Sequence, residues 1–219
     1  LYKSPITQEQ FTSDSETKTI GRLSSQKVGP TIADDIKQGA VWAVFIALIV
    51  MFIYIAIRFK KWEYGLSAVI SLFHDTLITI GLFSIFWGIL PFNLDVDQSF
   101  IAALLTIIGY SINDTVIIFD RIREYRGLYP KRDLKVNMND AINSTLGRTF
   151  NTSGTTLVVL LAIFIFGGEV IRGFAFALLI GIAIGTYSSI FNAAALSYDF
   201  ITASTHRKER KALKAKKVK

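Results

Sequence analysis

The sequence predicts an all-α membrane protein, a polytopic bundle of five transmembrane helices that follows a short extracytoplasmic N-terminal remnant. Hydrophobic residues make up 51% of the 219 residues and charged residues only 19%, and the mean hydropathy is positive at +0.43. The apolar residues gather in five runs, and about 20 helical residues cross a hydrocarbon core of about 30 Å. These runs are residues 39–58, 66–90, 99–119, 150–167 and 171–198, of which the fourth is the shortest.

The segment before the first run, residues 1–38, is polar and too short to enclose a core of its own. The chain begins at Leu1 without an initiator methionine or a signal-peptide pattern, so we interpret it as the C-terminal part of a longer protein. We expect residues 1–38 to be the end of an extracytoplasmic domain and its connection to the first span. Pro30 fits the first turn of the helix that leads into that span.

The basic residues predict the orientation of the spans, because short basic connections are typical of the cytoplasmic side. The connection after the first span is basic, and so are the loop expected at 120–147, with six Lys or Arg residues, and the tail at 201–219, with eight. We expect these segments on the cytoplasmic side of a bundle at 39–200, with the N-terminal segment outside. The tail either lies as a basic helix on anionic lipid or ribosomal RNA, or has no partner.

The second and third spans each carry a carboxylate. His74 and Asp75 lie in the second span, and Asn113, Asp114 and Thr115 lie in the third. A charged side chain in hydrocarbon costs about 3 kcal/mol even on lenient insertion scales, so it usually faces a cavity, a partner charge or a proton path. We expect this of Asp114. Asp75 either belongs to the same path or bonds to a neighbour such as His74.

The fourth span opens with a polar stretch, R-T-F-N-T-S-G-T-T, at 148–156. It places Arg148, Thr149, Thr152 and Ser153 in one half of a helix that suits a wet seam better than lipid. Two simpler interpretations stay open. Arg148 can extend to the lipid headgroups, and the hydroxyl groups can bond back to their own helix.

The fifth span carries small residues at every fourth position, including a strict G-x-x-x-G. Such a face lets another helix approach closely. We therefore expect a neighbouring helix to pack on it. The residues are Gly173, Ala177, Gly181, Gly185, Ser189 and Ala193.

Other function classes lack their sequence signals. The absence of cysteine excludes disulfides and thiol chemistry, and the two histidines, His74 and His206, are too few for a histidine metal site. The sequence has no G-x-x-x-x-G-K-[ST] loop, so we expect no ATP hydrolysis. We expect a transport subunit with no catalytic residues, no metal, no cofactor and no DNA partner.

Three segments carry a family resemblance: G-Y-S-I-N-D-T-V-I-I-F-D-R-I-R-E, G-R-T-F-N-T-S-G-T-T-L and F-G-G-x-x-I-R-G-F-A-F-A-L-L-I-G-I-x-I-G-T-Y-S-S-I-F. V-G-P before the first span, Y-I-A-I-R-F at its end and H-D in the second span fit the same pattern. Together they cover nearly everything from Val28 to about Ala194. The chain closely resembles the SecF family, whose members partner SecD in bacterial protein export and belong to the resistance-nodulation-division superfamily.

The resemblance implies a position and a role. Members have six transmembrane helices with an extracytoplasmic domain between the first two, and they work with SecD beside the SecYEG channel in the cytoplasmic membrane. They use the proton or sodium motive force to move exported, unfolded preproteins. On this pattern the chain holds the last five helices, from either a separate SecF or a fused SecD–SecF protein.

The resemblance also implies which residues act. The Asp of the N-D-T motif and the Arg of the R-T motif form the ion or proton relay of the family, and they fall on Asp114 and Arg148. Asp75 matches the H-D motif. Two other functions stay open, an exporter of small molecules or lipids from the same superfamily and a passive scaffold for other translocon subunits.

Overall fold

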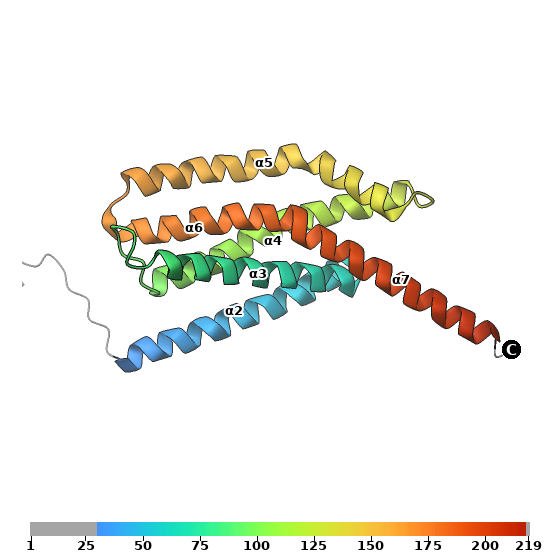
Figure 1. The fold of residues 1–219 in the computed structure, drawn as a ribbon, viewed down its shortest axis with the longest axis horizontal. Coiled ribbons are helices and arrows are strands. Elements are labelled where there is room, and N and C mark those ends of the chain that lie inside the picture. Colours follow the sequence, from blue (N-terminus) through green and yellow to red (C-terminus); the bar gives the residue numbers. More distant parts are fainter. Residues whose placement is uncertain (1–29, 218–219) are drawn as a thin grey trace, which may run out of the picture. The chain divides into compact units, whose positions relative to one another are not determined.

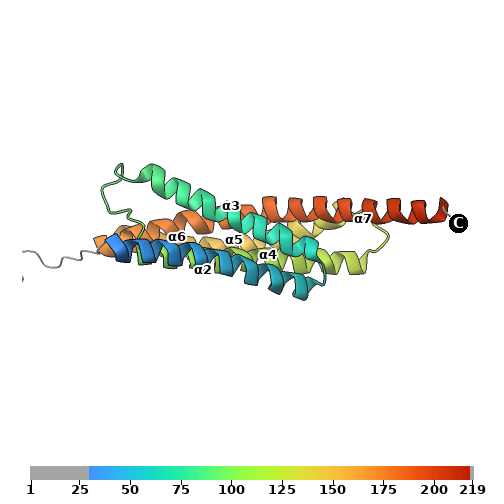
Figure 2. The same cartoon turned by 90° about the horizontal axis from the view of Figure 1, so that it is seen from below.

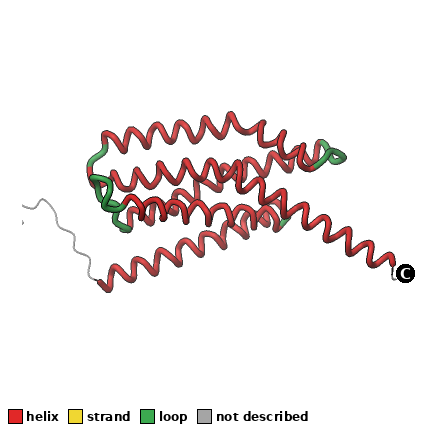
Figure 3. The backbone as a smooth tube through the Cα atoms, in the orientation of Figure 1, coloured by secondary structure: helices red, strands yellow, loops and turns green. Residues whose placement is uncertain are grey.

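The structure is a computed structural model that describes the backbone of residues 30–217. The expectation that residues 1–29 belong to an extracytoplasmic domain lies outside the described residues. The part of the chain from 30 to 217 contains helices and no strand (Figure 3). Five helices are long and apolar enough to cross a membrane, which confirms the predicted all-α polytopic bundle. The elements are α2 (Pro30–Phe59), α3 (Trp62–Phe86), α4 (Gln98–Leu128), α5 (Leu134–Phe166), α6 (Glu169–Ser188), the π-helical turn η1 (Ser189–Ala193) and α7 (Ala194–Lys217).

Local signals explain where several helices begin and end. Pro30 begins α2, as its fixed backbone angle favours. Lys60, at a φ of 54°, makes the tight turn into α3. Gly88, at a φ of 74°, lies in the turn after α3, so this helix ends at Phe86 and not at the predicted residue 90. Asp97 begins α4 because its side chain accepts a hydrogen bond from the Phe100 amide at 2.9 Å.

Residues 40–219 form one compact unit, and the packing described here is within it. Figures 1 and 2 show its helices running back and forth side by side. The α2–α3 turn, the α4–α5 turn and α7 lie at one end of this unit, and the α3–α4 and α5–α6 connections lie at the other (Figure 1). The three basic segments are therefore at one end. Helix α6 contacts α3, α4 and α5 and is the central helix of the unit.

The stretch 120–147, expected as a loop, is mostly helical. Helix α4 continues to Leu128 and α5 begins at Leu134, which leaves a connection of only a few residues. The polar composition of this stretch suggested a loop, but the stretch forms the end of α4 and the start of α5. Their contact buries a strip on α5 made by Asn137, Met138 and Ala141. The fifth span and the tail likewise form one continuous helical run, interrupted only by η1.

The small face of α6 lies against α4. A methyl group added at Gly181 would collide with the side chain of Ile107, and one added at Gly185 would lie 3.0 Å from Cβ of Ser111. At the other end of α6, a methyl group at Gly173 would lie 2.5 Å from the backbone oxygen of Asn93. All six small residues of this face are buried, namely Gly173, Ala177, Gly181, Gly185, Ser189 and Ala193. Helix α6 therefore approaches α4 more closely than larger side chains would permit.

Candidate functional site

Two carboxylates lie deep inside the bundle, and a third, Glu63, is buried near the start of α3. Asp75 of α3 and Asp114 of α4 are each only 1% exposed. Burial of a charge away from water is expensive unless partners compensate for it. The hydrogen bonds of the two side chains therefore indicate how each one is stabilised.

Asp75 has a partner for each oxygen. The Ser111 hydroxyl donates to Oδ2 at 2.9 Å, and Nδ1 of His74 lies 3.2 Å from Oδ1. The amide nitrogen of Asn192 lies 3.4 Å from the same His74 nitrogen. The contact between His74 and Asp75, one of the two interpretations of Asp75, is thus present. Asp75 is well satisfied by its neighbours.

Asp114 has a partner for one oxygen only. The Ser153 hydroxyl of α5 donates to Oδ2 at 3.2 Å, and the Thr186 hydroxyl of α6 donates to the Ser153 oxygen at 2.7 Å. The second oxygen, Oδ1, is buried and has no hydrogen-bond partner among the residues that the structure describes. A short chain of hydroxyl groups thus joins Asp114 to α5 and α6, while half of the carboxylate stays uncompensated.

A further hydroxyl pair links α4 to the π-helical turn. The Thr115 and Ser189 hydroxyl oxygens are 2.9 Å apart, and Ser189 also donates to the backbone oxygen of Ser111 at 3.1 Å. A π-helical turn carries one more residue than an α-helical turn, and such turns are frequent at functional sites. Here the turn η1 supplies Ser189 and Asn192 to the surroundings of the two carboxylates.

Arg148, expected as the partner of Asp114, does not contact it. Arg148 is exposed, and no ion pair links it to Asp114 within residues 30–217. Helical geometry gives the reason: Ser153 faces Asp114, and Arg148 lies five residues earlier, about 7.5 Å along the axis and about 140° around it. The expected pairing is therefore not made in this conformation.

Three other polar residues expected at the site, Asn113, Thr152 and Thr149, make no hydrogen bond to either carboxylate in the described part of the chain. Asn113 is exposed and so faces away from the buried carboxylate beside it in the sequence. Thr152 is exposed and donates to the backbone oxygen of Arg148 at 2.9 Å, which is the alternative of bonding back to its own helix. Thr149 is buried, and its hydroxyl has no hydrogen-bond partner in the described part of the chain.

Sequence reasoning missed three polar side chains around the carboxylates: Ser111 contacts Asp75, Thr186 contacts Ser153, and Asn192 contacts His74. Ser111 and Thr186 lie in quoted segments and Asn192 directly follows one, but none of the three was expected at the site. Ser111 could have been found from its position, because it lies three residues before Asp114 on the same helix. Thr186 and Asn192 carried a weaker signal, as polar residues in an apolar span whose small face suggested packing alone.

Comparisons with known proteins were consistent with these observations. The family model described as "Protein export membrane protein SecD/SecF, C-terminal" matches residues 7–203. The protein translocase subunit SecF of Rhodothermus marinus is 58% identical over 167 residues, which are 76% of this chain and 54% of the relative. The SecF subunit of Haemophilus influenzae is 43% identical over 182 residues, which are 83% of this chain and 54% of the relative. The chain spans about half the length of the curated relatives it matches.

Solved structures show the same likeness. The crystal structure of SecDF from Thermus thermophilus, a translocon-associated membrane protein, matches with a TM-score of 0.73 and 40% identity. That match covers 80% of this chain and 23% of the SecDF chain. A SecDF structure in a super-membrane-facing form matches with a TM-score of 0.71 and 38% identity, over 85% of this chain and 24% of that one.

Proposed function

The chain belongs to the SecD/SecF family of protein export membrane proteins, and we propose that it is the ion-coupling membrane part of a SecF-type export subunit. In this proposal the subunit uses the proton or sodium motive force to help unfolded preproteins cross the bacterial cytoplasmic membrane. Its partners would be SecD, as a separate chain or a fused half, and the SecYEG channel. The names of the relatives support the export function and do not favour an exporter of small molecules.

One observation carries the coupling part of this proposal. Asp114 is buried in the bundle with one carboxylate oxygen that lacks a partner. A buried, uncompensated charge is costly, and binding of a proton or a cation would remove that cost. Asp75, with both oxygens in contact with neighbours, is better suited to a supporting role.

Ion binding at Asp114 would act on the helices around it. The carboxylate bonds to Ser153 of α5, which in turn bonds to Thr186 of α6, so a change of its charge alters the attraction between three helices. Passage of one charge across 100 mV supplies about 2.3 kcal/mol, enough to shift the balance between two helix arrangements. Residues 1–38 would pass this movement to the domain outside the membrane.

Arg148 would be the switchable partner of Asp114. A shift or rotation of α5 could bring its guanidinium toward the carboxylate, because an arginine side chain reaches several ångströms along a helix. In that second state Asp114 would stay charged and release its ion. The exposed position of Arg148 supports the idea that its side chain can move.

Export of a preprotein into membrane vesicles tests the proposed function and the role of Arg148 together. Vesicles that contain the complete protein should export a preprotein faster when a proton or sodium gradient is imposed, and an ionophore should remove the gain. We expect Arg148→Lys to lose most of the gain, because lysine offers a point charge in place of a planar fork. Arg121→Lys, which changes an exposed ion pair with Glu124, is the matched control and should keep it. A full gain with Arg148→Lys would remove Arg148 from the mechanism.

Orientation is a separate prediction. We propose that the basic end of the bundle faces the cytoplasm. Single cysteines at Val96, which is 57% exposed in the α3–α4 connection, and at Lys131 and Ala212 report on the two ends. In cells whose outer membrane or wall has been removed but whose cytoplasmic membrane is intact, an impermeant thiol reagent should label Val96→Cys only. Labelling of Lys131→Cys and Ala212→Cys in place of Val96→Cys would reverse the orientation.

A further inference from the structure

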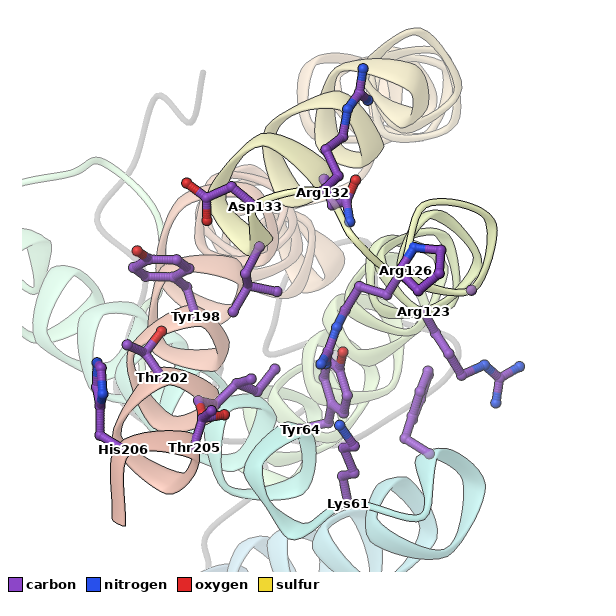
Figure 4. A pocket seen from close by; sticks show the side chains of 16 residues that line it. Lys61, Tyr64, Arg123, Arg126, Arg132, Asp133, Tyr198, Thr202, Thr205 and His206 are labelled. Carbon is purple, nitrogen blue, oxygen red and sulfur yellow. The ribbon is translucent and has the colours of Figure 1, made fainter. Parts of the chain in front are cut away.

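A pocket of about 750 Å³ lies at the basic end of the helix bundle. Its walls come from the end of α2, the start of α3, the α4–α5 turn and α7 (Figure 4). None of its lining residues belongs to the surroundings of Asp75 or Asp114, so the coupling mechanism does not account for it. The side chains that line it indicate what it can bind.

Four cationic side chains line the pocket, and two of them already have carboxylate partners. Arg123 lies 3.0 Å from Asp120, and Arg132 lies 2.7 Å from Asp140. The acidic residue on the pocket wall, Asp133, caps α5 by accepting a hydrogen bond from the backbone at 3.2 Å. The charges of Arg123 and Arg132 are therefore already balanced by carboxylates, and the Asp133 side chain is engaged by the backbone of α5.

The other two cations, Lys61 and Arg126, have no carboxylate within ion-pair distance among residues 30–217. Figure 4 shows Arg126 extending from α4 toward Lys61, whereas Arg123 points away from them. Burial is the main cause that lowers the pKa of the Lys61 ammonium, and the charges of Arg126 and Lys208 lower it further, against an opposite effect of Glu63. Lys61, which is exposed, and Arg126, which is half-buried, are thus two like charges close together, and an anion between them would stabilise both.

A buried hydroxyl group lies beside these two cations. Tyr64 is 2% exposed; the Arg126 guanidinium lies close to its hydroxyl, but no hydrogen bond of good geometry satisfies that hydroxyl within the described chain. The ring is held by Phe59 and Phe119, with centroids 5.3 and 4.9 Å away, so the hydroxyl cannot readily turn to another partner. The Thr202 hydroxyl, on the α7 wall, is also buried without a partner. Buried polar groups rarely stay unpaired, so these hydroxyl groups point to a ligand that accepts hydrogen bonds.

We propose that this pocket binds a phosphate group, either the headgroup of an anionic phospholipid or free phosphate. A tetrahedral phosphate has several acceptor oxygens, which suits the neighbouring donors of Arg126, Lys61 and Tyr64. A planar carboxylate has only two acceptor oxygens, so it suits these three donors less well. Basic pockets between membrane helices commonly hold lipid headgroups, and about 750 Å³ leaves room for one.

Binding to the purified complete protein in a neutral detergent tests this site. Three probes are titrated calorimetrically: a short-chain phosphatidylglycerol, the matching phosphatidylcholine and inorganic phosphate. We expect the phosphatidylglycerol to bind and the phosphatidylcholine to bind far more weakly, since its choline would meet Lys61 and Arg126. If inorganic phosphate binds as tightly as the phosphatidylglycerol, the ligand is free phosphate; if it does not, the ligand is the lipid headgroup.

Substitutions locate the binding. Lys61→Gln and Arg126→Gln should each weaken binding of the tighter probe by about tenfold or more, since each removes a charged hydrogen-bond donor. Tyr64→Phe should weaken it less, and it keeps the ring that packs on Phe59. Arg210→Gln with Lys214→Gln removes two charges from α7 outside this pocket and is the matched control.

Lys61 is exposed, so Lys61→Gln should fold normally. This variant keeps the test decisive even if Arg126→Gln fails to fold. Equal loss of affinity in the α7 control would show that binding follows net charge and not this pocket. Unchanged affinity in Lys61→Gln and Arg126→Gln, or equal binding of phosphatidylcholine, would also overturn the proposal. The test does not depend on ion coupling, because binding is measured without export.

Discussion

Replacement of Asp114 by asparagine should abolish the part of preprotein export that depends on the ion gradient, while the protein still folds and reaches the membrane. Asparagine keeps the size of the side chain and an oxygen that can accept the hydrogen bond from Ser153. It cannot bind and release a proton, and it carries no charge to attract a cation. The measurement is the gain in export rate when a gradient is imposed on vesicles.

Asp120→Asn is the matched control for this substitution. Asp120 lies on the same helix, and it forms exposed ion pairs with Arg58 at 2.9 Å and Arg123 at 3.0 Å. Exposed ion pairs contribute at most about 1 kcal/mol, so this variant should keep the gain from the gradient. A loss in Asp114→Asn and not in Asp120→Asn separates an intramembrane role from a general effect of removing a carboxylate from α4.

Normal gradient-dependent export in cells whose only copy carries Asp114→Asn would contradict the coupling proposal. It would also favour the scaffold interpretation, in which the chain only holds other subunits together. Asp75→Asn would then be the next variant to measure, because Asp75 is the other carboxylate that is only 1% exposed. If both variants export normally, neither carboxylate couples ions to export.

The spans and the position of Asp114 could be predicted because their signals are local. The lengths of the apolar runs determine how many helices can cross a membrane, and a carboxylate inside such a run is conspicuous at once. The same reasoning placed Ser153 at the site as part of a polar stretch. The structure brings Ser153 to the carboxylate at 3.2 Å.

The partners of the carboxylates could not be derived in the same way, because they depend on how helices dock. Arg148 and Ser153 belong to one motif, yet only Ser153 faces Asp114, since the rotation of α5 against α4 is set by tertiary packing. The turn η1 changes the helical phase at Ser189, and no local sequence signal predicted this turn. The helical hairpin at 120–147 was missed for the same reason, because its buried strip requires the contact between the two helices.

Replacement of Gly181 by leucine should prevent the bundle from packing normally, which is the largest structural effect we expect from one substitution. A methyl group at this position already collides with Ile107 of α4, and leucine adds three further carbon atoms in the same place. Overpacking of a tight contact costs about 1–3 kcal/mol and sometimes more. We expect a marked fall in the yield of monodisperse protein in detergent and in its unfolding temperature.

Gly109→Leu provides the control, since Gly109 lies on α4 with no atom within 4 Å of an added methyl group. It introduces the same side chain into the same bundle and should change the unfolding temperature little. Ile107→Ala removes the side chain that Gly181→Leu would strike, so the double variant should be more stable than Gly181→Leu alone. Such a rescue ties the effect to this one contact. Gly181→Leu that behaves like Gly109→Leu would mean that α6 does not pack on α4 as the structure describes, and the hydroxyl chain from Thr186 through Ser153 to Asp114 would lose its basis too.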